Sequence, residues 1–217
     1  MKTITSARGV SLAKRHLPLI WQGFESFWDI PCKIYLGNLD NFKPEPKPVL
    51  YYSVKTDEQH YYIIYCFFHP KDWATFPSSV LPGEVHDCDF EGILLQTPYY
   101  LPQHSPKPSA KIITVAHHSL LTESYDDGAK PAVTIDSQGH AIKPCDPSEI
   151  PDSQNYLLTQ SFKFISLDAQ GNVWWETMKT EFNKHGVCMP DQWGHHGKYV
   201  GWMWNQPDDL MKVMFSE

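Results

Sequence analysis

Short runs of apolar, β-branched and aromatic residues, separated by polar turns, make up most of this 217-residue chain. Two of them, 49–55 and 60–68, are separated by four polar residues, which predicts a β-hairpin. Further strands are predicted at 90–96, 111–118, 132–137, 162–167 and 173–176, the last two joined as a second hairpin. No apolar stripe of helical period alternates with these runs, so the pattern favours an all-β sandwich with long loops and few short helices over an α/β fold.

The length of the chain suits a single domain of this class, so we expect residues 1–217 to form one β-sandwich. Residues 1–42 have mixed character and precede a segment, 43–48, in which proline alternates with charge. We expect residues 1–42 to form an N-terminal arm that packs on the sandwich, with a short helix at 24–28 as an alternative for part of it.

Composition narrows the classes of function. The chain carries 18 Lys and Arg against 25 Asp and Glu, a net charge of −7, which argues against a nucleic-acid partner. No run of about 18 uncharged apolar residues predicts a membrane span. The N-terminus also lacks the apolar stretch of about 7–15 residues that a secretory signal needs. We therefore expect either a cytoplasmic protein or a secreted one numbered from its mature start, and the sequence indicates no oligomeric state.

The five cysteines give an odd count in a chain too large to need disulfides for its stability, and no CxxC pair is present. We expect them to be mainly reduced thiols. The alternative is a single disulfide such as Cys145–Cys188.

The segment 86–92 holds the residues with the clearest chemistry. Side chains alternate along a strand, so Asp89 and Glu91 are expected on one face, about 7 Å apart at their Cα atoms. His86 lies just before them, where an irregular backbone could bring its imidazole to the same point. Two converging carboxylates repel each other, and a divalent cation relieves this most simply. The alternative is a pair of solvated acids at the end of a strand.

The order of residues here resembles that of the Nep1-like (NPP1) necrosis-inducing proteins. An aromatic run ends in Pro70-Lys71-Asp72, and His86-Asp87-Cys88-Asp89-Phe90-Glu91-Gly92 follows after a loop, where that family has a Gly-His-Arg-His-Asp-Trp-Glu heptapeptide. The likeness covers residues 60–96, with Cys88 and Phe90 in place of the second His and the Trp. The segment is also similar to the broader Vps62-like set, in which a Gly-His pair follows a later strand, as Gly139-His140 does here.

This resemblance implies a β-sandwich that binds a divalent cation, usually described as magnesium or calcium, with manganese or zinc as alternatives. Carried over to this chain, the ligands are Asp72, His86, Asp89 and Glu91. His118 and His140 are additional candidates, although an inward histidine at a strand end is also a common core residue.

Two functions remain open beside a simpler one, an accessory protein whose cation only holds loops in place. In the first, the cation binds hydroxyl groups of a glycan or a lipid headgroup, an activity that could extend to membrane damage. The oxygen-rich ligand set of this hypothesis suits magnesium, calcium or manganese. In the second, the protein is a metal-dependent hydrolase in which His118 or His140 joins the site and the ion activates water. Two or more histidine ligands would favour the hydrolase.

Overall fold

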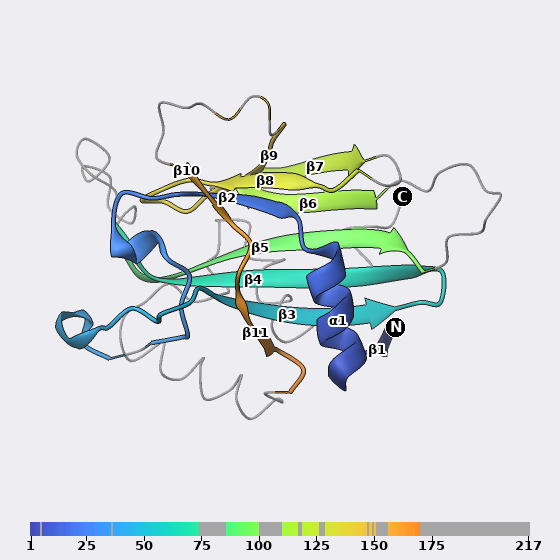
Figure 1. The fold of residues 1–217 in the computed structure, drawn as a ribbon, viewed down its shortest axis with the longest axis horizontal. Coiled ribbons are helices and arrows are strands. Elements are labelled where there is room, and N and C mark those ends of the chain that lie inside the picture. The colour runs from blue at the N-terminus through green and yellow to red at the C-terminus, as the bar shows by residue number, and fades with distance from the viewer. Residues whose placement is uncertain are drawn as a thin grey trace.

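A computed structural model of the chain describes residues 1–4, 6–35, 37–73, 86–99, 110–116, 119–125, 129–146, 148, 150 and 156–169. Strands dominate these residues and form two sheets (Figure 1). The elements are, in chain order, β1 (Lys2–Thr3), α1 (Ser6–His16), β2 (Leu19–Gly23), the 3₁₀ turns η1 (Phe27–Asp29) and η2 (Leu39–Asn41), β3 (Val49–Thr56), β4 (His60–Asp72), β5 (His86–Pro98), β6 (Ala110–Ala116), β7 (Ser119–Tyr125), β8 (Ala132–Ile135), β9 (Ile142–Pro144), β10 (Tyr156–Thr159) and β11 (Lys163–Ser166).

The larger sheet has the order β1-β3-β4-β5-β6-β7. Strand β11 also pairs with β3, at residues other than those that pair with β1. Strands β3 and β4 are antiparallel neighbours, which confirms the predicted hairpin. The run 162–167 does contain a strand, β11, but its partner among the described residues is β3, in parallel register. Residues 173–176, the other half of the second predicted hairpin, lie outside the described residues.

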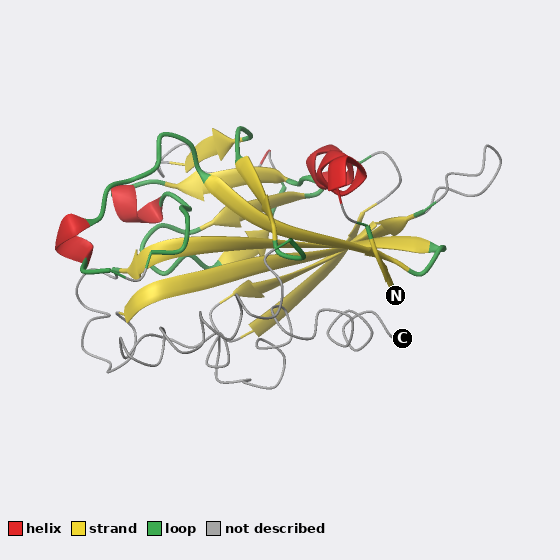
Figure 2. Cartoon of the chain, turned by 90° about the horizontal axis from the view of Figure 1, so that it is seen from below, coloured by secondary structure: helices red, strands yellow, loops and turns green. Residues whose placement is uncertain are grey.

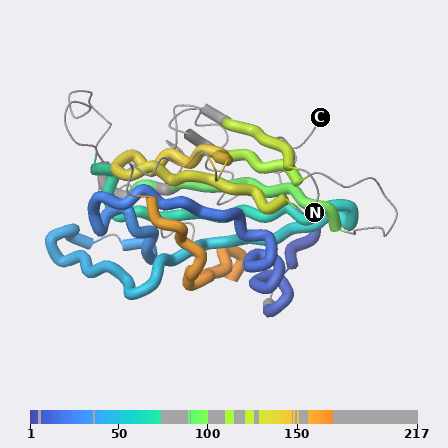
Figure 3. The backbone as a smooth tube through the Cα atoms, turned by 45° about the horizontal axis from the view of Figure 1, so that its top comes forward, coloured from blue at the N-terminus to red at the C-terminus, as the bar shows by residue number. Residues whose placement is uncertain are grey.

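The smaller sheet has the order β10-β2-β8-β9 within the described part of the chain. Strand β2 lies in its interior and pairs in parallel with β8 and antiparallel with β10. Figure 3 shows this blue N-terminal strand running beside the yellow strand β8. Residues 1–42 therefore contribute the short strand β1, a helix and an inner strand, as well as the two 3₁₀ turns that follow.

The core lies between the two sheets. Alternate residues of β4 and β5 are buried there, because side chains of a strand alternate between its faces. They meet apolar residues of β2, β8 and β9, and helix α1 covers part of the same core. The principal members are Ile20, Ile63, Tyr65, Phe67, Ile93, Leu95, Val133 and Ile142. Two packed sheets with one α-helix among the described residues confirm the predicted all-β sandwich (Figure 2).

Strands β4 and β5 are longer than the runs that predicted them, with 13 residues each. Their antiparallel register extends from His60 opposite Pro98 to Asp72 opposite His86. The added length contains polar residues that apolar patterning does not assign to a strand, but their backbone groups are satisfied by pairing with the neighbouring strand. This extension brings the polar ends of the two strands side by side.

Two further expectations can be compared with the structure. Cys145 is not in a disulfide, so the Cys145–Cys188 alternative is wrong. In the described part of the chain no helix has the length and apolar character needed to span a membrane.

Candidate metal centre

A group of ionisable side chains continues the core face of β4 and β5 where the apolar residues end. His69 follows Phe67 on β4 at an interval of two residues, and its partner in the ladder is Asp89. Glu91 lies opposite Phe67 in the same register. Asp89 and Glu91 are only 5% and 8% exposed, and His69 is fully buried. The register of one strand pair therefore buries two carboxyl groups and an imidazole beside one another.

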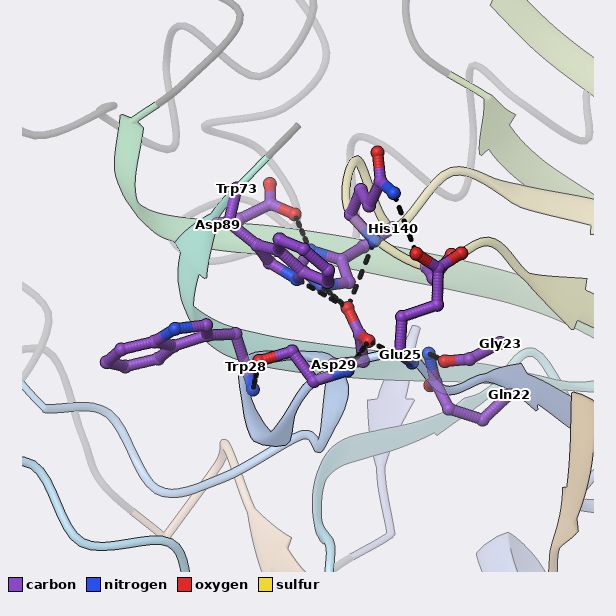
Figure 4. A network of polar contacts seen from close by, with 11 residues as sticks. Gln22, Gly23, Glu25, Trp28, Asp29, Trp73, Asp89 and His140 are labelled. Carbon is purple, nitrogen blue, oxygen red and sulfur yellow. Dashed lines mark hydrogen bonds and ion pairs between the residues drawn. The ribbon is translucent and has the colours of Figure 1, made fainter. Parts of the chain in front are cut away.

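His140 joins this group from the turn between β8 and β9. Its Nδ1 lies 2.8 Å from Oδ2 of Asp89, and its Nε2 lies 3.3 Å from Oδ1 of Asp29 (Figure 4). Burial disfavours a charge on this ring, but the hydrogen bonds to Asp29 and Asp89 outweigh burial and raise the pKa of His140 to about 9. In this arrangement His140 is an imidazolium that donates to two carboxylates.

Asp29 is positioned by the 3₁₀ turn η1. Ser26 and Asp29 form a capping box, in which the Asp29 carboxylate accepts hydrogen bonds from the backbone N–H groups of Glu25 and Ser26, each at 2.8 Å. Its other oxygen accepts from the Trp73 indole at 2.7 Å and from the backbone N–H of Gln138 at 3.0 Å. Although burial raises the pKa of Asp29, the hydrogen bonds from His140 and these donors lower it overall. Asp29 is thus a buried, ionised carboxylate.

His69 lies flat against His140, with ring centroids 3.7 Å apart and planes inclined by 6°. Neither of its ring nitrogens has a hydrogen-bond partner among the described residues. Burial, with a smaller contribution from the charge on His140, lowers the pKa of His69 far below its usual value. His69 is therefore neutral and has a lone pair available for a ligand.

Glu91 has an incompletely satisfied carboxyl group. Its Oε2 is buried and has no hydrogen-bond partner among the described residues. Burial, followed by the negative charges of Asp89 and Asp72, raises the pKa of Glu91 far above its usual value. The carboxyl therefore keeps a proton at neutral pH unless another positive charge compensates its neighbours. Two buried carboxyl groups, Asp89 and Glu91, with the half-buried Asp72 acting on Glu91, fit a divalent cation, whose charge would allow Glu91 to ionise.

A second set of potential ligand atoms overlaps the first at Asp89. One ligand atom each of His69, Asp89 and His140 lie within 4.8 Å of one another, and all three residues are buried. This set offers one carboxylate oxygen, the lone pair of His69 and, only if His140 loses a ring proton and the hydrogen bond that it makes, a second imidazole nitrogen. The site can therefore supply either an oxygen-rich or a nitrogen-rich environment to a metal ion.

Of the four predicted ligands, Asp89 and Glu91 lie on the core face of β5, and the charges of Asp89 and Asp72 both raise the pKa of Glu91. The fourth, His86, is opposite Asp72 in the β4–β5 ladder, but its side chain is outside the described residues. His140, named as an additional candidate, lies at the site. The other additional candidate, His118, is outside the described residues.

Sequence reasoning did not identify His69 or Asp29 as members of the site. A signal existed for each. His69 continues the two-residue period of Tyr65 and Phe67 on the buried face of β4, and a histidine in that place needs a polar partner. The spacing Ser26-x-x-Asp29 is that of a capping box, which indicates the turn but not the contact with His140.

Comparisons with known proteins give likenesses of fold only. No protein-family model matches the chain, and no curated protein matches it. Among solved structures, a triple mutant of NLPPya is 15% identical, with a TM-score of 0.48 and 84% of each chain covered. NLPPya in complex with mannosamine is 17% identical, with a TM-score of 0.44 and 78% of each chain covered.

A third similar structure is Necrosis and Ethylene inducing Protein 2 from the causal agent of cocoa's Witches Broom disease. It is 14% identical with a TM-score of 0.42, and the alignment covers 85% of this chain and 84% of that one. At identities and TM-scores this low, the neighbours carry no argument about function.

Proposed function

We propose that this chain is a divalent-cation-dependent binding protein that recognises hydroxyl groups of a glycan or a lipid headgroup. Asp72, Asp89 and Glu91 hold the cation, and His86 completes the ligand set. When bound, the cation supplies open coordination positions that hydroxyl oxygens can occupy. The residues of the chain bind and orient that cation and keep it at the edge of the buried core.

The state of Glu91 carries the proposal. A carboxyl with 8% exposure and an oxygen lacking a hydrogen-bond partner among the described residues is costly to bury, and proteins retain such groups where a ligand or ion satisfies them. The charges of Asp89 and Asp72 add to this cost. A cation between the three groups would convert their repulsion into attraction.

The donor atoms support a particular class of cation. Three carboxylates and at most one imidazole form an oxygen-rich set, which suits magnesium or calcium, with manganese as the alternative. The resemblance of residues 60–96 to the Nep1-like proteins implies the same ligands and the same class of ion.

Aromatic side chains near Asp29 support a ligand with a sugar ring or an interfacial lipid headgroup. Phe24, just before the capping box of η1, and Phe27, within it, are 37% and 42% exposed. The Phe27 ring lies 4.2 Å from that of Trp28 and stacks on Phe42 at 6.3 Å, measured between centroids. Exposed rings of this kind contact the apolar faces of sugars and the headgroup region of membranes.

Calorimetric titration of the chelator-treated protein with magnesium, calcium, manganese and zinc tests the proposal. Asp89→Ala and Glu91→Gln are expected to abolish stoichiometric binding of the preferred ion, and Asp72→Asn to weaken it at least 10-fold. Asp40→Asn, which changes an exposed acid in η2, is the control and should bind as the wild type does. Retention of wild-type affinity by both Glu91→Gln and Asp72→Asn would place the ion elsewhere.

A metal-dependent hydrolase is the second candidate, favoured by the close approach of His69, Asp89 and His140. If His140 gave up a ring proton to become a ligand, two histidines and a carboxylate would form a set suited to zinc, which activates a bound water for hydrolysis. This candidate predicts preference for zinc over magnesium and calcium, and loss of binding in His69→Phe. The first candidate, the binding protein, predicts preference for magnesium or calcium over zinc, and binding that is retained in His69→Phe.

A further inference from the structure

We infer that Asp29 and His140 are positioning residues, which hold the carboxylate of Asp89 with Oδ2 bound to His140 and Oδ1 directed to the cation. The inference rests on the proposed function and deepens it. It assigns a task to a buried carboxylate, Asp29, that belongs to neither ligand set.

Asp29 is the fixed end of this arrangement. Its carboxylate accepts hydrogen bonds from the backbone N–H groups of Glu25, Ser26 and Gln138 and from the indole of Trp73. These donors belong to three separate segments: the η1 turn, the end of β4 and the β8–β9 turn. A carboxylate held from so many directions cannot rotate freely, so its remaining contact, with Nε2 of His140, has a defined direction.

His140 transmits that direction to Asp89. In the plane of the ring it is held at both nitrogens, by Asp29 and by Asp89. Perpendicular to the plane, His69 packs against it at 3.7 Å. The backbone of His140 has a φ of 48°, in the left-handed region, and this turns the side chain from the β8–β9 turn into the core. The ring therefore has one orientation, in which Nδ1 faces Asp89.

This arrangement fixes the orientation of the Asp89 carboxylate, a ligand of the proposed cation. A carboxylate can rotate about its terminal torsion, and a metal ion binds less tightly when its ligand must first be ordered. Partners that hold a ligating group are worth about 10- to 100-fold in metal affinity. The Asp29–His140 pair is a partner of this kind, and it acts through Asp89 without touching the ion.

Three variants separate positioning from general stability. Asp29→Asn removes the charged acceptor. His140→Ala removes both contacts of the ring. His140→Asn keeps a side-chain N–H near the position of Nδ1, to donate to Asp89, and asparagine tolerates the left-handed backbone of this residue.

The control is Glu25→Gln, because the Glu25 carboxylate holds the same β8–β9 turn through Ser137 and Gln138 but makes no contact with His140. If general order of the turn were what mattered, this variant would weaken binding as well.

Titration of each variant with magnesium or calcium alone, whichever the wild type prefers, gives the first result. Asp29→Asn and His140→Ala are expected to weaken binding by about 10- to 100-fold. His140→Asn should stay within about 10-fold of the wild type, and adding Asp29→Asn to it should change nothing further. Equal losses in Glu25→Gln and Asp29→Asn, or an additive loss in the double variant, would overturn the inference.

Nuclear magnetic resonance of the metal-free protein gives a second result that does not depend on cation binding. The Nε2–H proton of His140 should exchange slowly in the wild type and in Glu25→Gln, and should exchange rapidly in Asp29→Asn. Slow exchange that persists in Asp29→Asn contradicts the inference even if the cation binds. A wild type that binds no cation contradicts the proposed function, and the exchange result then shows separately whether Asp29 holds His140.

Discussion

His69 and His140 lie face to face in the core, 3.7 Å apart and within 6° of parallel, yet they carry opposite protonation preferences. The pKa of His140 is raised to about 9 by its two carboxylate partners, whereas that of His69 is lowered by burial and by the charge on His140. His140 is thus a hydrogen-bond donor to Asp29 and Asp89, and His69 is a neutral ring stacked on it.

Replacement of His69 by Phe tests which role the neutral ring has. In the oxygen-rich site His69 only packs against His140, so the aromatic ring of phenylalanine preserves the contact and cation affinity should change by less than about 3-fold, within the weak energies of ring stacking. Calorimetric titration is the measurement. A complete loss of binding, in protein that melts as the wild type does, would make His69 a ligand and favour the hydrolase.

The raised pKa of Glu91 predicts how the metal-free protein responds to pH. The folded state keeps a proton that the unfolded state releases above its ordinary pKa of 4.5. The free energy of unfolding should therefore fall as pH rises above 4.5, with a slope of at most about 1.4 kcal/mol per pH unit from this group. Glu91→Gln removes that slope. Urea unfolding with chelator present, at several pH values between about 5 and 8, makes the comparison.

Addition of the cation should reverse the trend for the wild type, because binding requires the ionised carboxylate and becomes tighter as pH rises. Glu91→Gln should gain little from the ion. Identical pH profiles for the wild type and Glu91→Gln without metal would mean that Glu91 is ionised in the folded protein.

Phe27 tests the aromatic contribution to ligand binding. An amino sugar such as mannosamine is a suitable probe, because it carries a sugar ring and the hydroxyl groups that the proposed cation would bind. Phe27→Ser should weaken binding of the sugar in the presence of the cation by about 2- to 10-fold, the factor that corresponds to a stacking contact of roughly 0.5–1.5 kcal/mol. Affinity for the cation alone should stay unchanged. Unaltered sugar binding would remove the exposed rings from the recognition surface.

Tyr65 tests how helix α1 is held on the sheet. Its hydroxyl donates to the backbone carbonyl of Ala13 at 2.9 Å, and both groups are buried. Tyr65→Phe leaves that carbonyl without its donor and should lower the free energy of unfolding by about 1–2 kcal/mol. Tyr61→Phe is the comparison, because the Tyr61 hydroxyl accepts a hydrogen bond from the exposed Arg8 side chain and leaves no buried group unpaired when it is removed. Urea denaturation should show the larger loss for Tyr65→Phe.

Much of this protein follows from its sequence. The apolar runs at 49–55 and 60–68 specified the β3–β4 hairpin, because alternating apolar residues need a buried face and a polar break needs a turn. The same alternation put Asp89 and Glu91 on one face of β5, which is a property of the backbone and needs no partner strand.

Tertiary structure decided the rest, since it depends on contacts between distant segments. His69 lies opposite Asp89 because of the register between β4 and β5. The local sequence pattern does not determine that register, because a long segment separates the two strands. Asp29 and His140 are 111 residues apart and meet only because β2 lies beside β8 in the second sheet. The sequence alone identifies Asp89 and Glu91 as candidate cation ligands. The tertiary structure decides that His69, His140 and Asp29 lie around them.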